Sequence, residues 1–85
     1  MFSYSLVPVV DIYELEKELA ARHNYDFNEV PLAEILFGDD YSFGNYYRFD
    51  IADGIFYDVV AHEQARCILK QYYPFHDYVL INCYW

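Results

Sequence analysis

The residues with the greatest chemical capacity are three histidines, two cysteines and many carboxylates, so their spacing decides which reactions are possible. His62-Glu63-Gln64-Ala65-Arg66 begins like a helix that holds zinc between two histidines four positions apart, but Arg66 stands where the second histidine is needed. Cys67 precedes Ile68 and Leu69 in a predicted helix, where a buried, inert thiol is more frequent than a nucleophile. We therefore expect no metal site and no catalytic residue.

Glycines and paired carboxylates give no further catalytic pattern. The chain has only three glycines and no glycine-rich phosphate loop, which disfavours nucleotide chemistry. Asp39 and Asp40 are adjacent, but the ligand spacing of a calcium-binding loop is missing around them. The sequence predicts a protein that is not an enzyme and that needs no cofactor.

Composition predicts one globular, acidic domain spanning residues 1–85. Hydrophobic residues make up 56% of the chain, which is enough for a core, and 14 acidic against 5 basic residues give a net charge of −9. This charge repels nucleic acid and anionic membranes and attracts basic proteins. Excess charge can also serve solubility alone, and the sequence leaves that alternative open.

The termini and thiols predict a cytoplasmic protein. No apolar run approaches the roughly 18 residues of a membrane span, and the first residues lack the pattern of a signal peptide. Cys67 and Cys83 do not have CxxC spacing, so we expect both thiols to be reduced.

The first half of the chain predicts a strand followed by two helices. Residues 2–10 alternate apolar and polar side chains as a half-buried strand does. Asp11 is a helix cap with Glu14 three residues later, and Ile12, Leu15 and Leu19 give the following helix, to about His23, an apolar stripe. A short second helix is predicted over Leu32 to Phe37, begun by Pro31 and ended by Gly38.

The second half predicts a hairpin, a helix and a central strand. Asp53-Gly54 favours a two-residue turn that pairs Ile51 with Phe56 and Tyr47 with Val60, so these apolar residues face the core. The same register places Phe49 opposite Asp58, which indicates a shorter second strand or a longer turn. Residues 60–73 then predict a helix that buries Ala61, Ala65, Ile68, Leu69 and Tyr72, and residues 78–85 predict a buried central strand.

The predicted element order is strand, helix, short helix, strand, strand, helix, strand. This order indicates an α+β fold of the ferredoxin-like βαββαβ plan, with a four-stranded antiparallel sheet and the helices packed on one face. The plan hosts enzymes, RNA-binding proteins and inhibitors alike, so it does not name a function.

Aromatic and acidic side chains together predict a protein-binding surface. Tyrosine gives a large contact area at low entropic cost, and carboxylates beside it select and steer a basic partner. RNA binding by stacking on the strand aromatics is disfavoured, because Arg48 is the single cation among several nearby aspartates. The candidate contact residues are Asp11, Glu14, Glu18, Asp39, Asp40, Tyr46, Asp50, Asp53 and Tyr57.

In composition the chain resembles phage-encoded inhibitors of host defence, the anti-CRISPR and anti-restriction proteins, some of which mimic nucleic acid. The residues that carry this resemblance are Asp11, Glu14, Glu18, Asp39, Asp40, Asp50, Asp53 and Asp58. It implies a cytoplasmic inhibitor, acting in the host cell if phage-encoded, that blocks the basic nucleic-acid-binding surface of a larger enzyme or complex.

A second likeness is to immunity and antitoxin proteins of the barstar type, which are small acidic inhibitors of basic nucleases. It rests on the run YELEKEL at residues 13–19, followed by Tyr25 and a short helix. The sheet of that family is parallel, whereas Asp53-Gly54 predicts a hairpin here, so no site residues are transferred. The remaining rival is an oligomerising module whose tyrosine-rich sheet face pairs with itself, and the sequence leaves monomer and dimer open.

Overall fold

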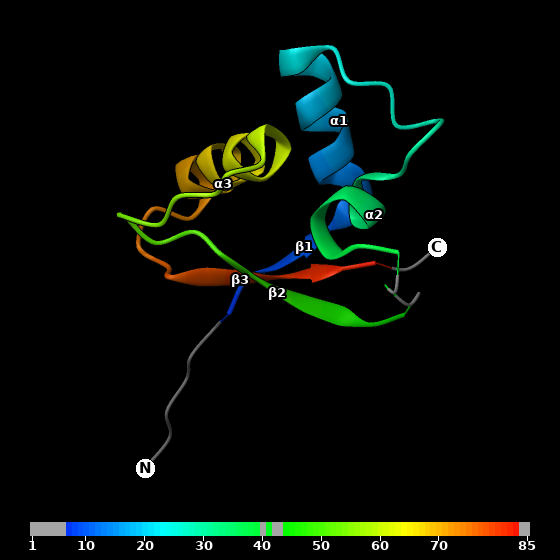
Figure 1. Cartoon of the computed structure of the whole chain (residues 1–85). Helices are drawn as coiled ribbons and strands as arrows, with labels where there is room; N and C mark the ends of the chain where they lie inside the picture. The colour runs from blue at the N-terminus through cyan, green and yellow to red at the C-terminus, as the bar shows by residue number, and fades with distance from the viewer. Residues whose placement is uncertain (1–6, 40, 42–43, 84–85) are drawn as a thin grey trace.

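The computed structural model describes residues 7–39, 41 and 44–83, which form three helices and one three-stranded sheet. Figure 1 shows the helices together on one side of the sheet. The elements in chain order are β1 (Val9–Asp11), α1 (Ile12–His23), α2 (Leu32–Phe37), β2 (Tyr46–Asp50), α3 (Val60–Tyr72) and β3 (Tyr78–Asn82).

Helix α1 follows β1 directly and has the predicted cap. The Asp11 side chain accepts a hydrogen bond from the amide of Tyr13 at 2.9 Å, which satisfies one of the unpaired amides at the start of the helix. Ile12, Leu15 and Leu19 are all buried, so the predicted apolar stripe faces the core. Both the helix and its stripe are confirmed.

Helix α2 has its predicted bounds, with one change at its start. Pro31 is the cap residue in extended conformation and not the first helical residue. Gly38 ends the helix with φ at +82°, in the left-handed half of conformational space that glycine adopts without a steric penalty. Leu32, Ala33 and Leu36 are buried.

Strand β3 lies at the centre of the sheet, in the order β1-β3-β2. It pairs parallel with β1, with Val10 opposite Ile81, and antiparallel with β2, with Phe49 opposite Val79. The central position predicted for this strand is confirmed over residues 78–82, and residues 84–85 lie outside the described part. The predicted first strand is confirmed only at its end, because residues 7–8 are not in a strand and residues 2–6 lie outside the described part.

The ferredoxin-like prediction is wrong, although the fold is α+β. The sheet has three strands and is mixed, whereas the prediction required four antiparallel strands. The missing strand is the second arm of the predicted hairpin, because residues 51–59 form a loop that leaves the sheet. Strand β2 pairs with β3 in its place.

The hairpin fails because β3 is a better partner for β2 than residues 55–60 are. Phe49 and Val79 are both buried where the two strands pair, whereas the predicted register set Phe49 against Asp58. After the strand, the amides of Ile51 and Ala52 both donate to the carbonyl of Asp77, at 2.8 and 3.0 Å, and turn the chain away from the sheet.

The core lies between the sheet and the helices. Ile51, Ala61, Ala65, Ile68 and Leu69 are buried there as predicted. Tyr47 is half-buried and stacks on Phe37, with 4.6 Å between ring centroids. Its predicted partner Val60 is exposed, as are Phe56 and Tyr72, so the prediction that Phe56 and Tyr72 are core residues is wrong.

Within the described part of the chain, no helix is both long and apolar enough to cross a membrane.

A candidate protein-interaction loop

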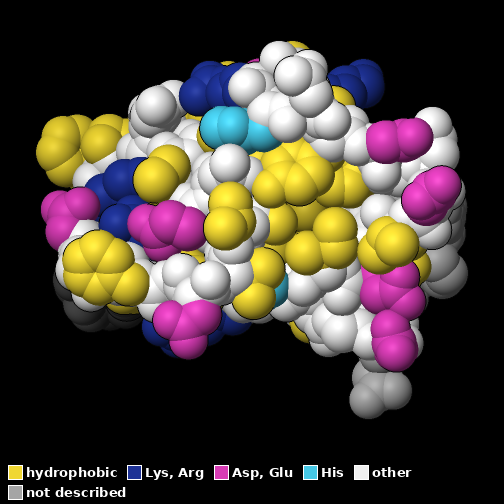
Figure 2. Space-filling model, turned by 45° about the horizontal axis from the view of Figure 1, so that its top comes forward, with side chains coloured by type: hydrophobic (Ala, Val, Ile, Leu, Met, Phe, Trp, Pro, Cys, Tyr) yellow, Lys and Arg dark blue, Asp and Glu magenta, His cyan; other side chains and the backbone are white. Residues whose placement is uncertain are grey.

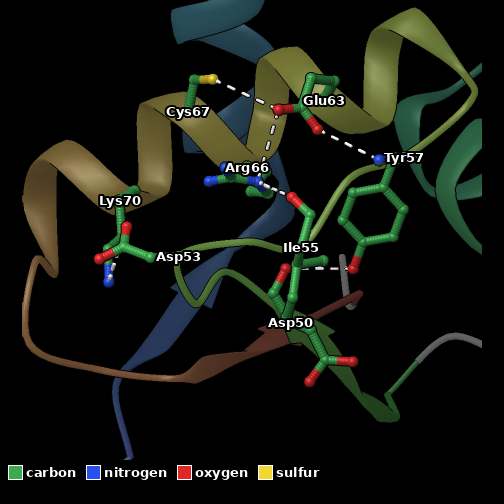
Figure 3. A network of polar contacts seen from close by, with 8 residues as sticks. All are labelled: Asp50, Asp53, Ile55, Tyr57, Glu63, Arg66, Cys67 and Lys70. Atoms are coloured by element: carbon green, nitrogen blue, oxygen red, sulfur yellow. Dashed lines mark hydrogen bonds and ion pairs between the residues drawn. The ribbon is translucent and has the colours of Figure 1, made fainter.

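The connection from β2 to α3, residues 51–59, is called the anchored loop here because polar contacts hold it along its length (Figure 3). Asp53 and Gly54 form a turn at the predicted position, with Gly54 at a φ of +85°, but Asp53 does not have the positive φ of the predicted hairpin turn. The amide of Ile55 donates to the carbonyl of Ala52 at 3.3 Å and closes this turn. The local prediction of a turn is therefore correct, although no hairpin follows from it.

Helix α3 holds the loop through two side chains one turn apart. Nε of Arg66 donates to the carbonyl of Ile55 at 2.7 Å, and Oε2 of Glu63 accepts from the amide of Tyr57 at 3.2 Å (Figure 3). The other carboxylate oxygen of Glu63 lies 3.4 Å from Nε of Arg66, so the two anchors also pair with each other. The Arg66 side chain is only 12% exposed. These contacts fix the backbone on both sides of Phe56.

Tyr57 points inward from the loop. Its ring stacks on Phe49, with 5.2 Å between centroids and 7° between planes, and its hydroxyl donates to the carbonyl of Asp50 at 3.1 Å. Burial raises the pKa of this hydroxyl, and the nearby Asp50 carboxylate adds to the shift. Tyr57 is thus a half-buried anchor, and its role as an exposed contact residue is not supported by its position.

Phe56 points outward between the two anchored residues. Its side chain is 82% exposed, whereas buried phenylalanine is the usual state in a small domain. The neighbouring connection from α3 to β3 presents Phe75, which is 95% exposed. The carbonyl of Asp77 joins the two connections by accepting from the amides of Ile51 and Ala52. Two exposed phenylalanines therefore lie in two loops that are hydrogen-bonded to each other.

Carboxylates accompany these rings. Asp53, Asp58 and Asp77 are all exposed in the same two connections. Two cations of α3 point toward the loop (Figure 3). Arg66 donates to the carbonyl of Ile55, and Nζ of Lys70 lies 3.9 Å from Oδ1 of Asp53. The outer surface of the loops is therefore apolar and negative.

Three of the sequence-predicted contact residues lie on β1 and α1, away from the anchored loop in the chain and in the fold (Figure 1). Asp11 is occupied as the helix cap. Glu18 accepts from Arg22 at 3.1 Å and from the hydroxyl of Tyr72 at 3.0 Å. Glu14 is exposed.

The remaining predicted residues are divided among three places. Asp53 is 91% exposed in the anchored loop, while Asp50, just before it, pairs with Arg48 at 2.9 Å. Tyr46 is 57% exposed at the opposite end of β2. Asp39 is exposed after α2, where its hydrogen bond to Glu34 raises the pKa of the Glu34 carboxyl. Asp40 lies outside the described residues.

The described side chains show no assembled metal centre, since no three of their His, Cys, Asp and Glu residues converge. The prediction that Cys67 is buried is wrong: it is exposed on α3, with its thiol 3.9 Å from Oε1 of Glu63. Cys83 is buried, and burial raises the pKa of its thiol to about 11.

Comparison with protein-family models, with curated proteins and with solved structures finds no match for this chain.

Four exposed residues of these two connections, which together with Asp53 are called the two-loop surface, were not among the predicted contact residues: Phe56, Asp58, Phe75 and Asp77. One signal was available for Phe56, because the predicted register failed at Phe49 opposite Asp58 and so indicated that the second hairpin strand was unsound. No local signal distinguished Phe75, which follows Pro74 in a short connection.

Proposed function

We propose that this chain is a small acidic inhibitor that docks on the basic nucleic-acid-binding surface of a larger protein through the two-loop surface: Asp53, Phe56, Asp58, Phe75 and Asp77. The observation that carries the proposal is the outward display of Phe56 between two residues that α3 holds in place. A loop positioned by a rigid scaffold is a frequent place for binding residues.

The rings supply the binding energy in this proposal. Fully burying one phenylalanine side chain contributes about 1.5 to 3 kcal/mol. Because Arg66 and Glu63 already order the loop around Phe56, docking does not require much further loss of conformational freedom. Exposed aromatic residues on an ordered loop have the character of interface hot spots.

The carboxylates supply selectivity. A surface with three exposed aspartates on a chain of net charge −9 is attracted to clusters of Lys and Arg and repelled by phosphates. Figure 2 shows acidic side chains spread among hydrophobic ones over the helical side of the molecule. A nucleic-acid-binding groove is rich in the basic residues that such a surface requires.

Two identities fit this chemistry: an anti-defence protein of a phage, and an immunity or antitoxin protein that inhibits a basic nuclease. The sheet still differs from the parallel sheet of the barstar type, since β1 pairs parallel with β3 but β2 pairs antiparallel with it. Both identities imply the same mechanism, which is exclusion of nucleic acid by occupation of its groove.

The test is displacement of labelled nucleic acid from a partner captured from the native host. The wild-type protein should displace it at low salt and less well at high salt. Added salt shortens the Debye length, which is about 8 to 10 Å near physiological ionic strength, and so weakens the charge pairs across the interface. The triple variant D53N/D58N/D77N should displace it much more weakly. The triple variant D26N/E29Q/D39N, which removes the same charge from exposed carboxylates elsewhere, should behave nearly as wild type. Equal loss in both variants would contradict a site at the two loops.

Self-association is a second candidate, favoured by the sheet face that no described helix covers (Figure 1). Val9 and Tyr46 are both exposed on that part of the sheet. Light scattering distinguishes the two functions, since a monomer at micromolar concentration agrees with the inhibitor and a tight dimer agrees with the oligomerising module.

A further inference from the structure

A second surface feature, separate from the two loops, is a groove of about 280 Å³ between α1 and α3. Its volume is at the lower limit of ligand pockets, about 300 to 1,000 Å³, so it suits one side chain better than a nucleotide. It is lined by Val10, Glu14, Leu15, Lys17, Glu18, Leu69, Tyr72 and Tyr73.

The groove combines an apolar floor with a held aromatic ring. Leu15 and Leu69 are almost fully buried beneath it. Tyr72 is 56% exposed at its wall, yet its hydroxyl donates to Oε1 of Glu18 at 3.0 Å, which fixes the end of the ring. Tyr73 adds a second, half-buried ring. Flat aromatic faces of this kind attract cations that lie within about 6 Å of the ring centre.

The two carboxylates of the groove differ in their contacts. The Glu18 carboxylate accepts from Arg22 and Tyr72, whereas the Glu14 carboxylate makes no hydrogen bond or ion pair with any residue that the structure describes. Lys17 is the one cation among the lining residues, and it is exposed. Glu14 therefore offers charge to a cation, and Lys17 opposes it.

We propose that this groove receives an arginine side chain of the basic partner, with the guanidinium paired to Glu14 and lying against Tyr72 and its aliphatic part over Leu15 and Leu69. The inference rests on the proposed function for the source of the arginine. Arginine suits the groove because its planar, weakly hydrated head both pairs with carboxylates and stacks on aromatic rings.

The test uses N-acetyl-arginine amide as the probe and isotope-labelled protein observed by NMR. Saturable shifts should appear at the amides of Leu15, Leu69 and Tyr72, and the neutral analogue N-acetyl-citrulline amide should not produce them. Glu14→Gln should weaken binding of the probe about two- to fivefold, as expected for a partly exposed ion pair. Lys17→Gln should tighten it by a similar factor, and Glu29→Gln, an exposed carboxylate outside the groove, should leave it unchanged.

Equal binding of the citrulline analogue, shifts spread over the whole acidic surface, or tighter binding in Glu14→Gln or weaker binding in Lys17→Gln would overturn the proposal. The experiment needs no partner, so its failure is distinct from failure of the proposed function, which the two-loop variants test. If the probe binds while Asp53, Asp58 and Asp77 prove irrelevant to partner binding, the proposed function fails alone.

Discussion

Arg66 is expected to be the principal anchor of residues 51–59, and Arg66→Met tests this while keeping most of the aliphatic bulk. The hydrogen bond from its charged Nε to the Ile55 carbonyl measures 2.7 Å and the side chain is 12% exposed. A hydrogen bond to a charged group contributes about 1.5 to 3 kcal/mol. The pair with Glu63 is more exposed and adds about 0 to 1 kcal/mol. Together they predict that Arg66→Met lowers the free energy of unfolding by about 1.5 to 4 kcal/mol.

Two measurements and one control test this prediction. Urea unfolding measures the free energy of unfolding, and amide hydrogen exchange measures the local effect on the loop. Exchange should become faster at the amide of Tyr57, which donates to Glu63. Lys70→Met is the matched control: its Nζ lies 3.9 Å from Oδ1 of the exposed Asp53 and 3.5 Å from the carbonyl of His76, and because both contacts are long its effect should stay below about 1 kcal/mol. Equal effects of the two variants, or unchanged exchange at Tyr57, would refute the reasoning that Arg66 anchors the loop.

Three further predictions concern the core and the thiols. Leu19 is fully buried, so Leu19→Ala should cost about 2 to 5 kcal/mol in urea unfolding, and a loss below about 1 kcal/mol would contradict its place in the core. Iodoacetamide at about pH 8 should label exposed Cys67 in the folded protein and Cys83 only after unfolding, because burial raises the pKa of Cys83 to about 11; equal labelling rates would be the contrary result. The contribution of Cys83 to the free energy of unfolding should be at its full value below about pH 8.5, the pKa of the thiol in the unfolded chain. It should be lost as the pH rises toward about 11, because the thiol then ionises in the unfolded chain while it is still protonated in the folded protein. Unfolding of wild type and Cys83→Ala from about pH 8 to 11 measures this loss as their difference, and a constant difference would contradict it.

Local structure could be predicted well because its causes are local. The cap at Asp11, the stripe Ile12, Leu15 and Leu19, and the turn at Asp53-Gly54 each depend on side chains within a few residues of one another. All three are present in the structure.

Strand pairing could not be predicted from the same patterns, because it depends on a competition between distant segments. The Asp53-Gly54 turn makes a hairpin possible but does not decide whether β2 pairs with the following residues or with β3. Strand β2 pairs with β3 because Val79 and Ile81 form an apolar face opposite Phe49 and Tyr47. The order of strands in the sheet follows from that competition.

The candidate site depended on this pairing, and so its prediction was only partly successful. Strand periodicity would place Phe56 inward and Tyr57 outward, whereas the loop reverses both, since Tyr57 stacks on Phe49 and Phe56 is exposed. Asp53 was the one sequence-predicted contact that lies exposed on the two-loop surface. The acidic character of the surface followed from composition, but its location required the fold.

The central claim, that Phe56 is the main contact with a basic partner, is tested most directly by partner affinity. The partner captured from the native host should be titrated with wild type, Phe56→Ala and Tyr46→Ala, the last removing an exposed aromatic ring at the far end of β2. We predict that Phe56→Ala weakens binding about tenfold or more, as for a hot-spot aromatic, and that Tyr46→Ala changes it by less than about twofold. Unchanged affinity in Phe56→Ala, with both variants folded, would contradict the claim.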